Sequence, residues 1–162
     1  MRERFRGLFF RAAGMLVLFV LTGCTVQMRF YPVQGPLASA NPSQVFLGKI
    51  TGTPGTRSGG FSAVLGKGET FQGRWTMVPA GAQGANTGLG APQGGISSVW
   101  DSVYGNGFYV AHVLGQRQYG RASVTGSNGT ALTMEIFSPN SGGEPKAVAK
   151  DDQGNVFKVV AF

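Results

Sequence analysis

Residues 120–137, GRASVTGSNGTALTMEIF, contain two strand-like runs joined by a tight turn. The turn is centred on Asn128-Gly129, a pair that supplies the positive φ angles that a tight hairpin turn demands. Beyond it, Thr133 and Glu135 alternate with apolar residues, which are Leu132, Met134 and Ile136. This period of two predicts a β-hairpin with one apolar and one polar face.

Further strand-like runs separated by turn residues lie on both sides of this hairpin. They are QVFLGKITG (44–52), FSAVLG (61–66), TFQGRWTMV (70–78), GFYVAHVLG (107–115) and KAVAKDDQGNVFKVVAF (146–162). The last of these contains a second hairpin, which turns at residues 152–155. The spacing predicts an all-β fold, mainly an antiparallel meander, that closes into a small barrel or folds into a sandwich to hide its apolar face.

One short segment departs from the strand period. The low-complexity stretch 79–95 predicts a glycine-rich loop, and apolar residues then recur at helical spacing in ISSVWDSVYG (96–105). We therefore expect one short amphipathic helix over 96–104, packed on the sheet. Ser97 or Ser98 is a suitable N-cap, and Gly105 is a suitable end.

Composition favours a single domain and argues against a nucleic-acid partner. The chain has 162 residues, of which 27 are glycine and 13% are charged, and its formal charge is +7. Four arginines and one glutamate put +3 of that charge in residues 1–23, so only +4 remains for the rest. This remainder is mildly basic and falls short of a nucleic-acid-binding footprint.

The N-terminus has the three parts of a secretory signal. Arginines in the first eleven residues precede the apolar run 15–21, and small residues follow before Cys24. The apolar run is too short to cross a bilayer, which takes about 20 residues. We expect residues 1–23 to be a signal peptide.

Leu21-Thr22-Gly23-Cys24 resembles the lipobox of bacterial lipoproteins. The resemblance implies that the Cys24 sulfur receives a diacylglyceryl group, that cleavage falls between Gly23 and Cys24, and that the new amine is acylated too. Thr25, in place of an aspartate, implies the outer membrane of a Gram-negative-type bacterium, with the domain in the periplasm or exposed at the surface. The alternative is an ordinary signal peptide with an incidental cysteine.

Residues 24–44 predict a lipidated N-terminus and a tether to a single β-rich domain over 45–162. Pro32, Pro36 and Pro42 break regular structure there. Val26, Met28 and Phe30 nevertheless alternate with polar residues, which leaves an edge strand open. Cys24 is the one cysteine, so the mature fold has no disulfide and depends on packing.

Catalytic and metal-binding sets are hard to assemble from this sequence. His112 is the one histidine and lies in a predicted strand, where a partly buried, hydrogen-bonded role is the simpler interpretation. A metal site needs several His, Cys or carboxylate ligands, and no paired carboxylates stand out. We expect no enzymatic activity, no metal and no cofactor.

Aromatic residues offer the remaining candidate for a ligand face. The candidate residues are Trp75, Trp100, Tyr104, Tyr109, His112 and Arg117. They could line a groove for a glycan or peptide. The alternative is that these rings pack a helix onto the sheet.

The sequence thus predicts a lipid-anchored envelope protein with a non-catalytic binding or structural role at the outer membrane. Its partner beyond the membrane would be an envelope protein, peptidoglycan or lipopolysaccharide. An alternative is a small inhibitor or a glycan- or peptide-binding module, similar to the lipid-anchored β-barrel lysozyme inhibitors, although those generally carry a disulfide. An envelope hydrolase is the third hypothesis.

Overall fold

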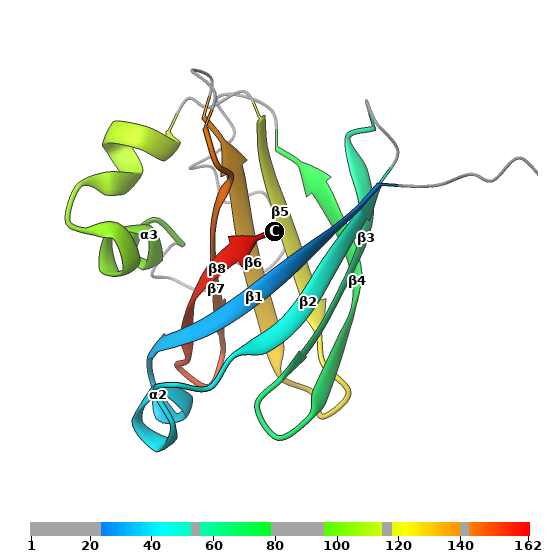
Figure 1. The fold of residues 1–162 in the computed structure, drawn as a ribbon, viewed down its shortest axis with the longest axis vertical. Coiled ribbons are helices and arrows are strands. Elements are labelled where there is room, and N and C mark those ends of the chain that lie inside the picture. Colours follow the sequence, from blue (N-terminus) through cyan, green and yellow to red (C-terminus); the bar gives the residue numbers. More distant parts are fainter. Residues whose placement is uncertain (1–23, 53–55, 79–95, 115–117, 140–142) are drawn as a thin grey trace, which may run out of the picture.

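The chain forms a closed antiparallel β-barrel of eight strands in a computed structural model that describes residues 24–52, 56–78, 96–114, 118–139 and 143–162 (Figure 1). The strands follow chain order around the barrel, and β1 pairs with β8 to close it. They are β1 (Cys24–Gln34), β2 (Phe46–Gly52), β3 (Ser58–Leu65), β4 (Glu69–Met77), β5 (Gln118–Thr125), β6 (Ala131–Ser138), β7 (Lys146–Asp151) and β8 (Val156–Ala161). The all-β meander prediction is confirmed, and the barrel replaces the sandwich.

The predicted central hairpin is formed by β5 and β6. Thr125 pairs with Ala131, and Gly129 has the positive φ of 91° that the sequence required at the turn. Glu69 from the start of β4 reaches this turn and accepts hydrogen bonds from the backbone N–H of Asn128 (3.0 Å) and the hydroxyl of Thr130 (2.8 Å). The hairpin is thereby joined to the neighbouring β3–β4 hairpin.

The segment predicted as a tether is part of the barrel. Residues 24–34 form β1, which is hydrogen-bonded to β2 on one side and β8 on the other. The alternation of Val26, Met28 and Phe30 therefore indicated the strand correctly, whereas the prolines had favoured a tether. Pro32 lies at a register shift beside β8, where a missing N–H is tolerated. The short helix α2 (Pro36–Ala40) follows.

The barrel interior is filled by apolar side chains from all eight strands. Their buried members are Met28, Phe30, Phe46, Phe61, Ala63, Leu65, Phe71, Ala122, Leu132, Met134, Ala147, Ala149, Phe157 and Val159. Eight strands enclose a space that side chains can fill completely. Gly48 makes room for this packing, since a Cβ there would lie 2.7 Å from the Phe30 ring.

The predicted helix is confirmed as α3 (Ile96–Tyr104), which packs on the outer face of β7 and β8. Gly105 ends it with a φ of 110°, and its N–H donates to the carbonyl of Asp101 at 3.0 Å. In Figure 1, α3 lies to one side of the barrel, outside the sheet.

The strand predicted over 107–115 is wrong. Tyr109–Val113 instead form a π-helical turn, η1, in which the N–H of Leu114 donates to the carbonyl of Tyr109 at 2.9 Å. Asp101 accepts the Tyr109 N–H at 2.9 Å and fixes the start of the turn. A short run of apolar residues does not by itself distinguish a strand from a helix, and here Tyr109 and Val113 share the buried face.

Two predicted segments, the signal peptide over 1–23 and the loop over 79–95, lie outside the described residues. Among the helices that are described, none has the length and apolar content to span a membrane.

Candidate functional site

Cys24 lies at the very start of the barrel. It is exposed, it is a free thiol, and it is the first residue of β1, where it pairs with Gly52 at the end of β2. Its neighbour Thr25 pairs with Thr51 in the same ladder. A lipid on the Cys24 sulfur would consequently be joined to the barrel wall without a flexible spacer.

Glu135 is the most deeply buried charged residue among those described. It points outward from β6, as the alternation predicted, but α3 covers it and leaves 0% of it exposed. Trp100 of α3 donates its indole N–H to Glu135 Oε2 at 2.9 Å, and Arg121 of β5 donates from Nε to Oε1 at 2.9 Å. The Arg121 Nη2 is 2.7 Å from the same oxygen. The predicted solvent-facing position of Glu135 is therefore a buried ion pair.

This ion pair affects the ionisation of its aromatic neighbours. Burial raises the pKa of Tyr119 far above its usual value, and the nearby Glu135 carboxylate adds to the rise. The pKa of Tyr109 is also raised by burial and by Glu135. Burial alone would lower the pKa of Arg121, but its pairing with Glu135 outweighs this and the net direction is upward. The arrangement keeps the two tyrosines neutral and Arg121 charged.

The predicted aromatic set assembles only in part. Trp100 is fully buried and stacks on Tyr104 (5.7 Å between ring centroids), and it meets Phe137 edge-on at 5.4 Å. Tyr104 stacks on Phe108 (4.7 Å), whose ring lies 4.7 Å from that of His112. The rings thus run from the buried indole of Trp100 to the exposed imidazole of His112. The prediction that His112 is partly buried in a strand is wrong, because it lies exposed in η1.

The remaining members of that set lie elsewhere. Trp75 belongs to β4, packs against the barrel interior and donates its indole N–H to the carbonyl of Thr51 at 3.0 Å. Arg117 is outside the described residues. The structure therefore does not bring the described candidate residues to one groove, and Trp100 and Tyr109 serve mainly to pack α3 and η1 onto the sheet.

Asp101 and Asp151 are used in turns and caps. Asp151 accepts the backbone N–H of Gln153 (3.0 Å) and that of Asn155 (2.8 Å), and Asp101 accepts the Tyr109 N–H. Within the described ranges, no group of three or more His, Cys, Asp or Glu residues is placed to hold a metal ion.

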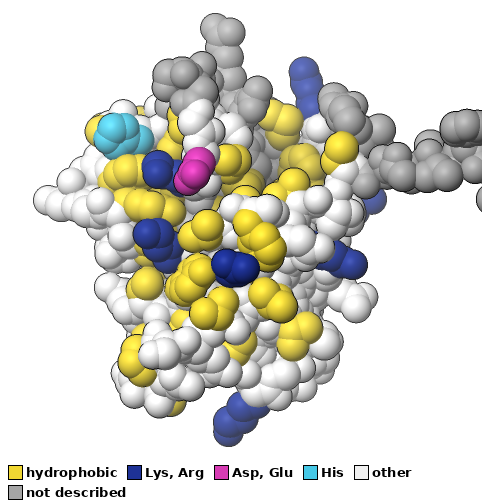
Figure 2. Space-filling view, viewed as in Figure 1, with side chains coloured by type: hydrophobic (Ala, Val, Ile, Leu, Met, Phe, Trp, Pro, Cys, Tyr) yellow, Lys and Arg dark blue, Asp and Glu magenta, His cyan; other side chains and the backbone are white. Residues whose placement is uncertain are grey.

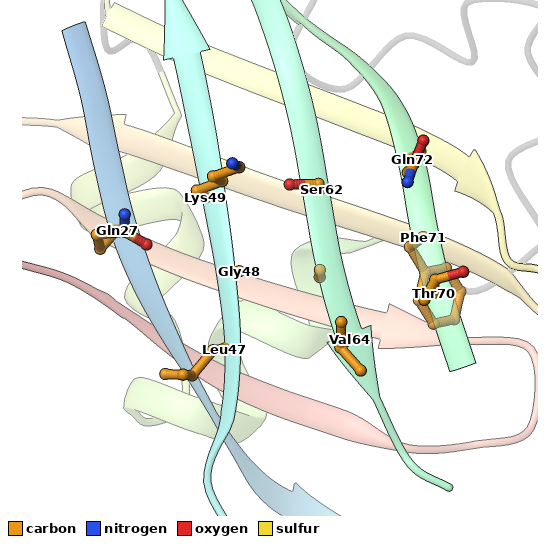
Figure 3. Close-up of a pocket in the computed structure, with 10 residues that line it drawn as sticks. Gln27, Leu47, Gly48, Lys49, Ser62, Val64, Thr70, Phe71 and Gln72 are labelled. Atoms are coloured by element: carbon orange, nitrogen blue, oxygen red, sulfur yellow. The ribbon is translucent and has the colours of Figure 1, made fainter. Parts of the chain in front are cut away.

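The outward side chains of β1–β4, which we term the open wall, surround a hollow that the sequence analysis missed. Its volume is about 290 Å³. Figure 3 shows a row of polar side chains across the four strands and a second row next to it. By strand register, the first row is Gln27, Lys49, Ser62 and Gln72, and the second is Arg29, Leu47, Val64 and Thr70.

A signal for the open wall was present in QVFLGKITG. Phe46 and Gly48 point inward there, so Leu47 must point outward with Lys49. Leu47 is 60% exposed, and its cross-strand partner Val64 is 48% exposed. These two side chains form an exposed apolar pair on an otherwise largely polar face.

Comparison with known proteins adds no family to this description. No protein-family model matches the chain, and neither a curated protein nor a solved structure matches it.

Proposed function

We propose that this protein is a lipid-anchored component of a bacterial envelope, with a non-catalytic binding or structural role at the outer membrane. The observation that carries the proposal is the position of Cys24. The last residue of the lipobox-like tetrad is also the first residue of the barrel, and it is exposed for modification. Two or three acyl chains at this point would give stable attachment, whereas one alone is marginal.

The barrel itself supports a role other than catalysis. Its interior is occupied by aromatic and aliphatic side chains, and both oxygens of Glu135 are engaged by Trp100 and Arg121. A general acid or base has to reach a substrate proton, and the Glu135 carboxylate is enclosed beneath α3. An envelope protein, peptidoglycan or lipopolysaccharide is the partner class that we propose for the exposed surface.

The proposal is tested by replacing the sulfur. We expect Cys24→Ser to abolish fatty-acid labelling and to leave an unprocessed precursor, while the barrel stays folded because Cys24 is exposed and makes no core contact. Metabolic labelling, membrane fractionation and mass spectrometry of the N-terminal peptide are the measurements.

A matched control keeps one thiol in the chain but moves it. The double variant Cys24→Ser, Ala111→Cys has its thiol on the exposed part of η1, far from the tetrad in sequence, and it should remain unlabelled. Normal outer-membrane fractionation of Cys24→Ser, or a wild-type N-terminal peptide that is unmodified or begins upstream of Cys24, would refute the lipid anchor.

A further inference from the structure

The open wall differs from the rest of the barrel in having no described helix over it. Both α3 and η1 pack on the outer face formed by β5–β8, whereas α2 contacts β1 with its Leu37 packed against the interior cluster. Figure 1 shows the broad outer surface of β1 and β2 uncovered. On this surface the side chains of Leu47 and Val64 are exposed.

The charge of the open wall has a single sign. Its cations are Arg29, Lys49 and Arg74, one from each of β1, β2 and β4. Among the described residues of β1–β4, none of the outward-pointing side chains is a carboxylate. The wall is therefore complementary to an anionic surface and has no acid of its own to neutralise it.

Exposed apolar side chains lie among these cations. Leu47 and Val64 face each other across β2 and β3, between Arg29 on one side and Thr70 on the other. The Arg29 guanidinium lies 4.3 Å from the centroid of the exposed Phe162 ring. Figure 2, in the view of Figure 1, shows hydrophobic side chains across the front of the barrel around β1, with Lys and Arg side chains among them. Cations mixed with exposed apolar groups suit the headgroup region of a bilayer, where phosphates and acyl chains are both within reach.

The anchor residue begins a strand that contributes to the open wall. Cys24 begins β1, and Arg29 lies five residues along that strand, or about 17 Å at the rise of an antiparallel strand. Because β1 starts at the lipidated residue, the wall would remain close to the bilayer surface.

We propose that the open wall lies against the anionic phospholipid surface in which Cys24 is anchored. Arg29 and Lys49 face lipid phosphates, and Leu47 and Val64 enter between the headgroups. This inference rests on the proposed lipid anchor, and it adds an orientation: β5–β8, with α3 and η1, face away from the membrane and are presented to the periplasm.

The test uses the purified lipidated protein, reconstituted into phosphatidylcholine vesicles with and without phosphatidylglycerol. The Cys24 sulfur is a thioether in this form, so one introduced cysteine can carry a polarity-sensitive fluorophore. Gln72→Cys places the probe on the open wall in β4, away from the anchored strand, and Ala111→Cys places it on η1. Circular dichroism verifies that both labelled variants keep the fold.

We expect the Gln72 probe to shift to shorter wavelength on vesicles that contain phosphatidylglycerol, and to lose most of that shift at high salt. The Ala111 probe should not shift. Lys49→Glu should abolish the Gln72 shift, whereas Lys67→Glu, with the same charge change in the exposed β3–β4 turn, should leave it intact.

Failures of the two proposals are distinguishable. Protein that does not float with either kind of vesicle contradicts the lipid anchor. Protein that floats normally while the Gln72 probe stays unshifted, or shifts equally without phosphatidylglycerol, overturns the wall contact. The emission of the Gln72 probe could instead shift in lipid-free detergent solution, by an amount that grows with protein concentration. That result would show that a second copy of the chain covers the open wall, and it would overturn the proposed contact with phospholipid.

Discussion

The two halves of the barrel have the same alternating inner face but opposite outer faces. On the covered wall, formed by the outward side chains of β5–β8, the residues Tyr119, Phe137 and Val148 are buried under α3 and η1. On the open wall, the outward residues are mainly polar or basic, and Leu47 and Val64 remain exposed. The inner face therefore determines the fold, and the difference between the outer faces determines which surface is left for other molecules.

The covered wall has a polar centre within an apolar layer. Glu135 lies there with no exposed surface; its carboxylate is paired with the charged Arg121 and accepts a hydrogen bond from the indole N–H of Trp100. Breaking such a pair by removing one partner is more costly than losing an exposed pair, because a charge or polar group is left buried without its partner. The covered wall should therefore be sensitive to substitution, and the open wall should not.

The largest effect is expected for Trp100→Ala. This change removes a fully buried indole and leaves Glu135 without one of its donors, and we expect a loss of about 3–5 kcal/mol in the free energy of unfolding. Chemical denaturation followed by circular dichroism gives the value. Trp100→Phe is the matched control: it retains most of the packing, so its smaller loss estimates the N–H···Glu135 bond. A loss below about 1 kcal/mol for Trp100→Ala would show that α3 contributes little to the barrel.

Strand alternation explains how much of this fold could be predicted. The inward residues of the β5–β6 hairpin, such as Leu132 and Met134, follow the period of two and are buried as expected. The helical spacing of Ile96, Val99 and Trp100 likewise predicted α3 and its buried side. These elements were accessible because local periodicity and burial agree in them.

The features that sequence missed depend on contacts between distant parts of the chain. The strand β1 is held by its pairing with β2 on one side and β8 on the other. The sequence near residues 24–34 does not indicate either of these partners. The strand alternation predicts that Glu135 lies on the polar outer face, but α3 covers that position and buries it. The segment 44–52 indicates that Leu47 and Lys49 point outward, but the rows that they form with β1, β3 and β4 follow only from the strand register.

The covered wall also predicts an alkaline sensitivity. The pKa of Tyr119 is raised above the 10.0 of a free tyrosine, so the folded protein keeps this proton when the unfolded chain has lost it. The corresponding stability is complete below pH 10 and is lost as pH rises further, at up to about 1.4 kcal/mol per pH unit for one group. Unfolding free energies at pH 8, 10 and 11 should therefore fall more steeply for the wild type than for Tyr119→Phe. Parallel curves for the two proteins would contradict the assignment to Tyr119.

The smallest effect is expected on the open wall. Leu47 is 60% exposed, so Leu47→Ala removes few packed atoms, and we expect the free energy of unfolding to change by no more than about 0.5 kcal/mol. Leu65, on the adjacent β3 and almost fully buried inside the barrel, is the matched control, for which Leu65→Ala should cost about 2–5 kcal/mol. Both values come from the same denaturation measurement. If Leu47→Ala proved nearly as destabilising as Leu65→Ala, the open wall would have to be packed against another part of the chain, and its exposed apolar pair could not serve an external contact.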